Sequence, residues 1–150
     1  MTVPDRIERE VVIDAPIERV WRLVTEPEHL ARWFGETAEL DLRPGGEGRL
    51  TWEGHPSARM RVLAVEPPHR FAFRWIRGGD AAPAEGSETV VELTLTAAEG
   101  QAARTHVRVV ERGFPALDRP AADQARYAEE NTRGWAVELE ELRAYAASSR

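Results

Sequence analysis

The chain has 150 residues, of which 42% are apolar and 31% are charged, a composition typical of one folded domain. It contains no cysteine and no lysine, which excludes disulfides, thiolate chemistry, Schiff-base chemistry and a P-loop lysine. The net charge of −6 argues against a general role on nucleic acid, and no apolar run approaches the roughly 20 residues of a membrane span. The first residues form no apolar signal core, so we expect a cytoplasmic protein with a single domain over residues 1–150.

The N-terminal part of the chain predicts one strand followed by two short helices. Residues 7–13 alternate loosely between apolar and charged side chains, as an edge strand does. Pro16 suits the first position of a helix, and an apolar face follows at helical spacing, made of Ile17, Val20, Trp21 and Val24. A second short helix is expected over residues 27–33, ending at Gly35.

From Glu36 to Arg112 the apolar residues recur at every second position. This period predicts six strands joined by short turns, which together form an antiparallel meander. The alternation is clearest over residues 70–75, and residues 77–87, rich in Gly, Ala and Pro, are expected to form a loop. In the last strand Glu111 has the same parity as its apolar neighbours, so we expect it to face the protein interior.

The period returns to that of a helix near Pro120. Trp135, Leu139, Leu142 and Ala146 step by four, three and four residues, and the same stripe extends back through Ala128 to Ala121. This predicts one helix of about 27 residues, roughly 40 Å long. Only this helix is long enough to cover the apolar face of the sheet. We therefore expect an α+β fold in which a curved antiparallel sheet of about seven strands wraps around the C-terminal helix.

Five short sequences in this chain carry a resemblance to a known family. They are IDAPIERVW at 13–21, LARWF at 30–34, PGG at 44–46, ERGF at 111–114, and Gly134-Trp135 followed by Leu139 and Leu142. In this order they resemble the helix-grip superfamily, also called Bet v 1-like, START or SRPBCC, and its branch related to the activator of Hsp90 ATPase. The resemblance implies an internal apolar cavity and, for stand-alone bacterial domains, often no established activity. Because the chain begins directly at the first strand, without the N-terminal domain of eukaryotic Hsp90 activators, we expect no chaperone partner.

The inner stripe of the long helix is uneven, which predicts a cavity. Its C-terminal half carries large residues, whereas its N-terminal half carries Ala121, Ala125, Ala128 and the polar Asn131 or Thr132. Small residues facing a curved sheet leave space that side chains, water or a ligand must fill. We expect a cavity under the N-terminal half, with its entrance beside Trp33 and Phe34; the alternative is an ordinary close-packed core. The predicted binding residues are Trp33, Phe34, Leu50, Trp52, Met60, Val62, Phe71, Phe73, Trp75, Val91, Leu93, Glu111, Ala128, Asn131, Thr132 and Trp135.

Glu111 is the polar residue of greatest interest in this set, because a buried carboxylate needs hydrogen bonds or a counter-charge. It would either anchor the polar group of a ligand, act as an acid or base, or pair with an arginine such as Arg133 at a purely structural site. The alternative to all three is that the twist of the strand carries it to the rim of the sheet. The histidines His29, His55, His69 and His106 lack the spacing of a zinc helix and are expected to be solvated. No metal and no cofactor are therefore expected.

Three functions remain open from the sequence. The leading expectation is a non-catalytic protein that binds a small hydrophobic molecule, either a lipid or an aromatic, polyketide-like compound. The second is an enzyme of the cyclase, aromatase or dehydratase kind that uses Glu111 as its acid or base. The third is an Hsp90-type chaperone interaction module that uses the outer face of the sheet. We expect no nucleic-acid partner, no insertion into a membrane, and a monomer or homodimer.

Overall fold

The fold is taken from a computed structural model that describes residues 2–77, 88–98 and 103–148. Strands, α-helices and one 3₁₀ helix (η1) follow in the order β1 (Arg6–Ile13), α1 (Ile17–Thr25), α2 (Pro27–Trp33), β2 (Thr37–Leu40), β3 (Glu47–Trp52), β4 (His55–Glu66), β5 (Arg70–Arg77), β6 (Thr89–Ala97), β7 (Thr105–Arg112), η1 (Phe114–Ala116) and α3 (Ala121–Ser148). Residues 78–87 of the expected loop lie outside the described residues.

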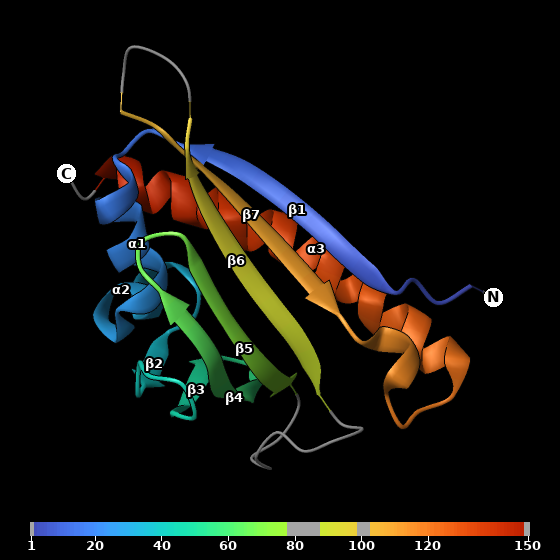
Figure 1. The fold of residues 1–150 in the computed structure, drawn as a ribbon. Coiled ribbons are helices and arrows are strands. Elements are labelled where there is room, and N and C mark those ends of the chain that lie inside the picture. Colours follow the sequence, from blue (N-terminus) through green and yellow to red (C-terminus); the bar gives the residue numbers. More distant parts are fainter. Residues whose placement is uncertain (1, 78–87, 99–102, 149–150) are drawn as a thin grey trace.

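The seven strands form one antiparallel sheet in the order β1-β7-β6-β5-β4-β3-β2. Strands β2 to β7 follow one another along the chain as a meander, and β1 closes the sheet by pairing with β7. Helix α3 runs along one face of this curved sheet, and α1 and α2 lie near its C-terminal end (Figure 1). This architecture confirms the expected helix-grip fold with its long C-terminal helix and two short helices after the first strand.

The buried stripe of α3 follows the predicted spacing except in its first turn. Its buried residues are Gln124, Ala128, Asn131, Trp135, Leu139, Leu142 and Ala146. Ala121, which the stripe was expected to include, is exposed. The first turn rests on the segment around η1, because the Gln124 side-chain amide donates to the carbonyl oxygens of Pro115 at 3.2 Å and Leu117 at 2.7 Å. The inner face of the helix therefore begins later than its sequence suggests.

The outer face of the sheet carries cross-strand pairs of opposite charge. Arg108 on β7 contacts Glu8 on β1 at 2.6 Å, and Arg70 on β5 contacts Glu92 on β6 at 2.6 Å. Because these arginines are paired with acids on the neighbouring strand, this part of the face is not a basic patch for an anionic partner. Within the described part of the chain, no helix combines the length and the apolar character that crossing a membrane requires.

The pair of Glu8 and Arg108 generates a prediction about the edge of the sheet. The hydrogen bond from Arg108 holds the pKa of Glu8 below its ordinary value. Because the folded-state pKa is depressed, the pair stabilises the fold at neutral pH, and its contribution is lost as the pH falls through the pKa of Glu8. Replacing Arg108 with Gln should raise the pKa of Glu8 toward its ordinary value, which carbon NMR of the side-chain carboxyl would measure. An unchanged pKa would show that Arg108 does not act on Glu8 in solution.

Candidate functional site

The candidate site is built around Glu111, near the end of β7. Its neighbours across the sheet are Ile7 on β1 and Val91 on β6, so it lies inside the sheet and not at an edge. Strand alternation directs its side chain toward α3, as the parity with Val107 and Val109 predicts. The residue is completely buried, with 0% of its surface exposed. A carboxylate in this position must be compensated by its surroundings.

Four hydrogen-bond donors surround the Glu111 carboxylate. Oε2 accepts from Thr89 Oγ1 at 2.5 Å, from Trp75 Nε1 at 2.9 Å and from Asn131 Nδ2 at 3.0 Å. Oε1 accepts from Trp135 Nε1 at 2.9 Å. A carboxylate accepts and does not donate, so these partners match its chemistry. Its donors come from β5, β6 and α3, so one side chain joins three strands to the long helix.

An arginine does not supply this compensation. Among the residues that the structure describes, Glu111 forms no ion pair, and Arg133 instead pairs with Glu129 at 2.5 Å on the outside of α3. Of the three roles that the sequence left open for Glu111, the structural pairing with Arg133 is therefore wrong. The donors that hold the carboxylate in the described part of the chain are all neutral.

An aromatic cluster lies beside this network. Phe34, which follows α2, has its ring centroid 5.1 Å from that of Trp33, 5.2 Å from that of Trp135 and 5.9 Å from that of Trp75. The rings of Phe34, Trp75 and Trp135 lie within 30° of one another, whereas Trp52 meets Phe34 edge-on at 83°. The Trp33 indole donates to the carbonyl oxygen of Leu23 at 2.7 Å, which ties the end of α2 to α1. Phe34 is thereby fixed against the two indoles that Glu111 holds.

A pocket of about 300 Å³ opens beside this cluster. It is lined by Phe34, Trp52, Trp75, Asn131, Arg133, Gly134, Trp135, Val137 and Glu138. Six of these nine residues belong to α3, and the exposed Val137, with 59% of its surface accessible, marks the open side. Glu111 does not line the pocket, but it binds three of the side chains that do: Trp75, Asn131 and Trp135. It is therefore a positioning residue for the pocket wall.

Gly134 is the least expected residue of this wall. Glycine in the interior of a helix costs about 1 kcal/mol relative to alanine. A Cβ atom built at Gly134 would meet no other atom within 4 Å, so close packing does not require a glycine there. Gly134 itself lines the pocket. The glycine thus removes a side chain where the pocket meets the helix.

The structure brings together part of the predicted binding set. Phe34, Trp52, Trp75, Asn131 and Trp135 line the pocket, and Glu111 lies directly behind them. Trp33 stacks on Phe34, and Thr132 donates to the carbonyl oxygen of Ala128 at 2.7 Å. The remaining predicted residues do not line this pocket and belong to the buried core: Leu50, Met60, Val62, Phe71, Phe73, Val91, Leu93 and Ala128.

The pocket also lies at a different place along α3 from the expected cavity. The sequence placed it under Ala121, Ala125, Ala128 and Asn131 or Thr132, whereas the pocket is lined from Asn131 onward, so the two overlap only at Asn131. Ala128 is 1% exposed and shares one buried cluster with large side chains of the sheet, including Phe71 and Phe73. Ala128 therefore belongs to the buried core and does not line the pocket. Gly134, Val137 and Glu138 also line the pocket and were not among the predicted site residues, although a glycine inside a long helix is a signal in the sequence.

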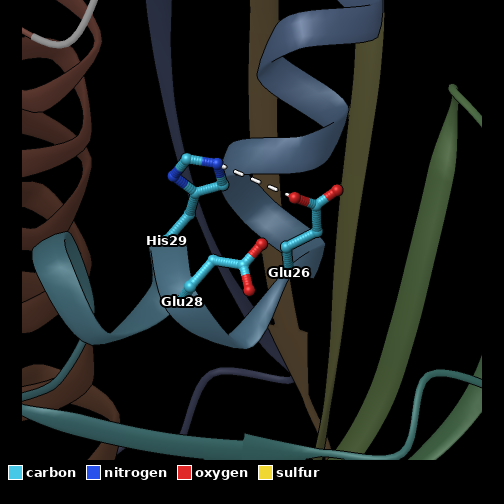
Figure 2. A group of neighbouring side chains, drawn as sticks. All are labelled: Glu26, Glu28 and His29. Carbon is cyan, nitrogen blue, oxygen red and sulfur yellow. Dashed lines mark ion pairs between the residues drawn. The ribbon is translucent and has the colours of Figure 1, made fainter.

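A cluster of Glu26, Glu28 and His29 lies at α2, where its carboxylate oxygens and imidazole nitrogens come within 4.8 Å of one another (Figure 2). Nδ1 of His29 is hydrogen-bonded to the Tyr145 hydroxyl on α3 at 2.7 Å, and Nε2 lies 3.7 Å from Glu26. The expectation of a solvated His29 is therefore wrong. Both ring nitrogens face protein partners, so we interpret the cluster as a link between α2 and α3 and not as a metal site.

The two oxygens of Glu111 are unequally supported, which predicts unequal effects of two matched substitutions. Trp135→Phe would leave Oε1 without its donor, whereas Trp75→Phe would leave Oε2 with Thr89 and Asn131. Both changes remove an indole N–H from a buried ring. We expect Trp135→Phe to lower the free energy of unfolding by about 1–3 kcal/mol and Trp75→Phe to lower it by less. Urea unfolding followed by circular dichroism would measure the difference, and a larger loss for Trp75→Phe would contradict this assignment.

Ala128 distinguishes the two positions proposed for the cavity. A cavity under Ala128 would accept a larger side chain, but a filled core would not. Because Ala128 is buried in the core cluster, we expect Ala128→Trp to destabilise the protein by about 1–3 kcal/mol or more. Thermal unfolding would measure this, and an unchanged melting temperature would restore the position that the sequence suggested.

Comparison with known proteins identifies the family. The family described as "Activator of Hsp90 ATPase homolog 1-like protein" matches residues 14–147, while no curated protein matches the chain. DynU16, a protein in the dynemicin biosynthetic locus whose crystal structure is known, is 27% identical to this chain, and the two structures have a TM-score of 0.76. The match covers 98% of this chain and 49% of DynU16, so this chain spans about half the length of DynU16.

Two further solved structures share the fold along nearly their whole length. Protein MLL2253 from Mesorhizobium loti is 24% identical with a TM-score of 0.78, covering 97% of this chain and 98% of that one. The Aha1 dimer from Colwellia psychrerythraea is 18% identical with a TM-score of 0.70, covering 94% of this chain and 95% of that one. The chain belongs to the family of activator of Hsp90 ATPase homolog 1-like proteins, within the helix-grip superfamily.

Proposed function

We propose that this protein binds a small, largely apolar molecule in the pocket beside Gly134 and catalyses no reaction on it. The observation that carries the proposal is Gly134 itself, a destabilising residue in a long helix that faces open space and not a packed neighbour. The wall around it is aromatic and is held in place by Glu111. A concave, mostly apolar site with a few fixed polar groups is what small-molecule binding requires. Either a compact lipid or an aromatic compound would satisfy this apolar wall.

The enzyme alternative is weakened by the position of Glu111. An acid or base must reach the proton that it transfers. Glu111 lies behind the pocket wall, and both of its oxygens already accept hydrogen bonds from protein donors. The ionisable residues that line the pocket are Arg133 and Glu138. Cyclase, aromatase or dehydratase chemistry by Glu111 would first require this network to open.

The chaperone alternative derives from the family description and would use a different surface. An Hsp90-type partner bound to the outer sheet would contact cross-strand charge pairs such as Glu8 and Arg108. Binding of such a partner would not change when a larger side chain is placed in the pocket. Because the Colwellia relative is described as a dimer, we retain both a monomer and a homodimer for this protein.

Two substitutions at Gly134 test the proposal. Gly134→Ala adds one methyl group and should raise stability by up to about 1 kcal/mol while leaving most of the pocket open. Gly134→Trp should fill the pocket and abolish binding while the protein remains folded. The neutral fluorescent probe N-phenyl-1-naphthylamine would report binding, and circular dichroism would report folding.

The two variants control for each other, because both remove the glycine and only one fills the space. Native mass spectrometry of the gently purified protein would also reveal a co-purifying small molecule, which Gly134→Trp should lose. Equal binding of the probe to the wild type and to folded Gly134→Trp would show that the pocket is not the binding site. A chaperone that binds equally to both proteins would support the interaction module instead.

A further inference from the structure

Building on the proposed function, we infer that the pocket selects an apolar cation, such as an arylammonium or alkylammonium compound, over neutral or anionic molecules of the same skeleton. The inference rests on three features of the described site: the aromatic residues of the wall, the carboxylate directly behind that wall, and the charges at the rim.

Aromatic side chains form the inner part of the pocket wall. Phe34, Trp52, Trp75 and Trp135 all line the same pocket, and three of the four are indoles. The face of an aromatic ring carries partial negative charge, and tryptophan attracts a cation more strongly than tyrosine or phenylalanine does. Such a contact strengthens when the cation leaves water, as it would in a pocket with few polar groups. This wall would therefore favour an ammonium group carried on an apolar body.

Glu111 adds a full negative charge behind two of these rings. Trp75 and Trp135 each donate their indole N–H to its carboxylate at 2.9 Å. A hydrogen bond to an anion polarises the donor, so electron density shifts toward the indole ring. Within the described residues Glu111 has no ion-pair partner, and buried charges are poorly screened by salt. The carboxylate thus gives the pocket a negative potential without touching the ligand.

The charges at the rim do not cancel this potential. Arg133 and Glu138 both line the opening and carry opposite charges. The Arg133 side chain is 77% exposed and is paired with Glu129, so water and its partner reduce its effect on the pocket. The one buried charge of the site is the carboxylate of Glu111. The attraction on a bound cation therefore comes from Glu111, behind the aromatic wall, and not from the charges at the rim.

Three naphthalene compounds of nearly equal size provide the test. Calorimetric titration at neutral pH would compare 1-naphthylmethylammonium, 1-naphthalenemethanol and 1-naphthoate, which are cationic, neutral and anionic. We expect the cation to bind at least about tenfold more tightly than the alcohol, and the anion to bind most weakly. If the alcohol binds as tightly as the ammonium compound, the charge preference is wrong while the proposed binding function stands. If neither these compounds nor the neutral probe bind, both fail.

The source of the preference is tested by salt and by substitution. Because Glu111 is buried, the preference should persist at about 0.5 M salt, whereas a preference that arises at the exposed rim should vanish. Glu111→Gln keeps an accepting oxygen and the size of the side chain but removes the charge, so the cation should lose most of its advantage over the alcohol. Glu140→Gln, an exposed acid of α3 that does not line the pocket, is the matched control and should change nothing.

The salt measurement needs no variant, so it decides the question even if Glu111→Gln fails to fold. A preference abolished by salt, or one that survives in folded Glu111→Gln, would overturn the role assigned to the buried carboxylate. A preference that withstands salt and disappears in Glu111→Gln would support it.

Discussion

Burying a carboxylate without a counter-charge costs free energy, and at Glu111 hydrogen bonds from surrounding side chains compensate for the lost hydration. Its two oxygens accept hydrogen bonds from Trp75, Thr89, Asn131 and Trp135, which reach it from two other strands and from the long helix. These bonds form together only if β5, β6, β7 and α3 keep one relative position. Hydrophobic contacts are not directional and tolerate repacking, whereas directional bonds to a single group favour one arrangement. The network therefore fixes the register of α3 on the sheet.

Much of the fold could be predicted because each element has its own periodic pattern. The alternation in Phe71, Phe73 and Trp75 identifies a strand without reference to any neighbour, and the spacing from Trp135 to Ala146 identifies the buried face of α3. Of the predicted helices, only the C-terminal one is long enough to cover the apolar face of the sheet. The prediction failed at Ala121, because the first turn of α3 packs on the segment around η1, and helix periodicity does not reveal what a helix packs against.

The site was predictable only in part, because its contacts join residues distant in the sequence. Strand parity placed Glu111 inside, but its partners lie 20 to 36 positions away on other elements. Arg133 was a poor candidate for the ion-pair partner of Glu111 because of its position on the helix. It lies two positions after Asn131 and two before Trp135, and two residues turn a helix by about 200°, which directs it away from the face that they share. The position of the pocket depended on how the sheet residues filled space, which the volumes of the helix residues alone could not show.

The concentration of the pocket on one helix has a consequence for how this site can change. Positions 133, 134, 137 and 138 sit on α3 at the open side of the pocket, while the indoles behind them are held by the buried carboxylate. Substitutions in this short stretch can alter the shape and charge of the entrance without disturbing a strand or the core. The indoles held by Glu111 therefore form a fixed part of the pocket, whereas the α3 positions at its opening can vary. Under the proposed function, related domains would acquire new ligand preferences by changing one or two turns of this helix, at little risk to folding.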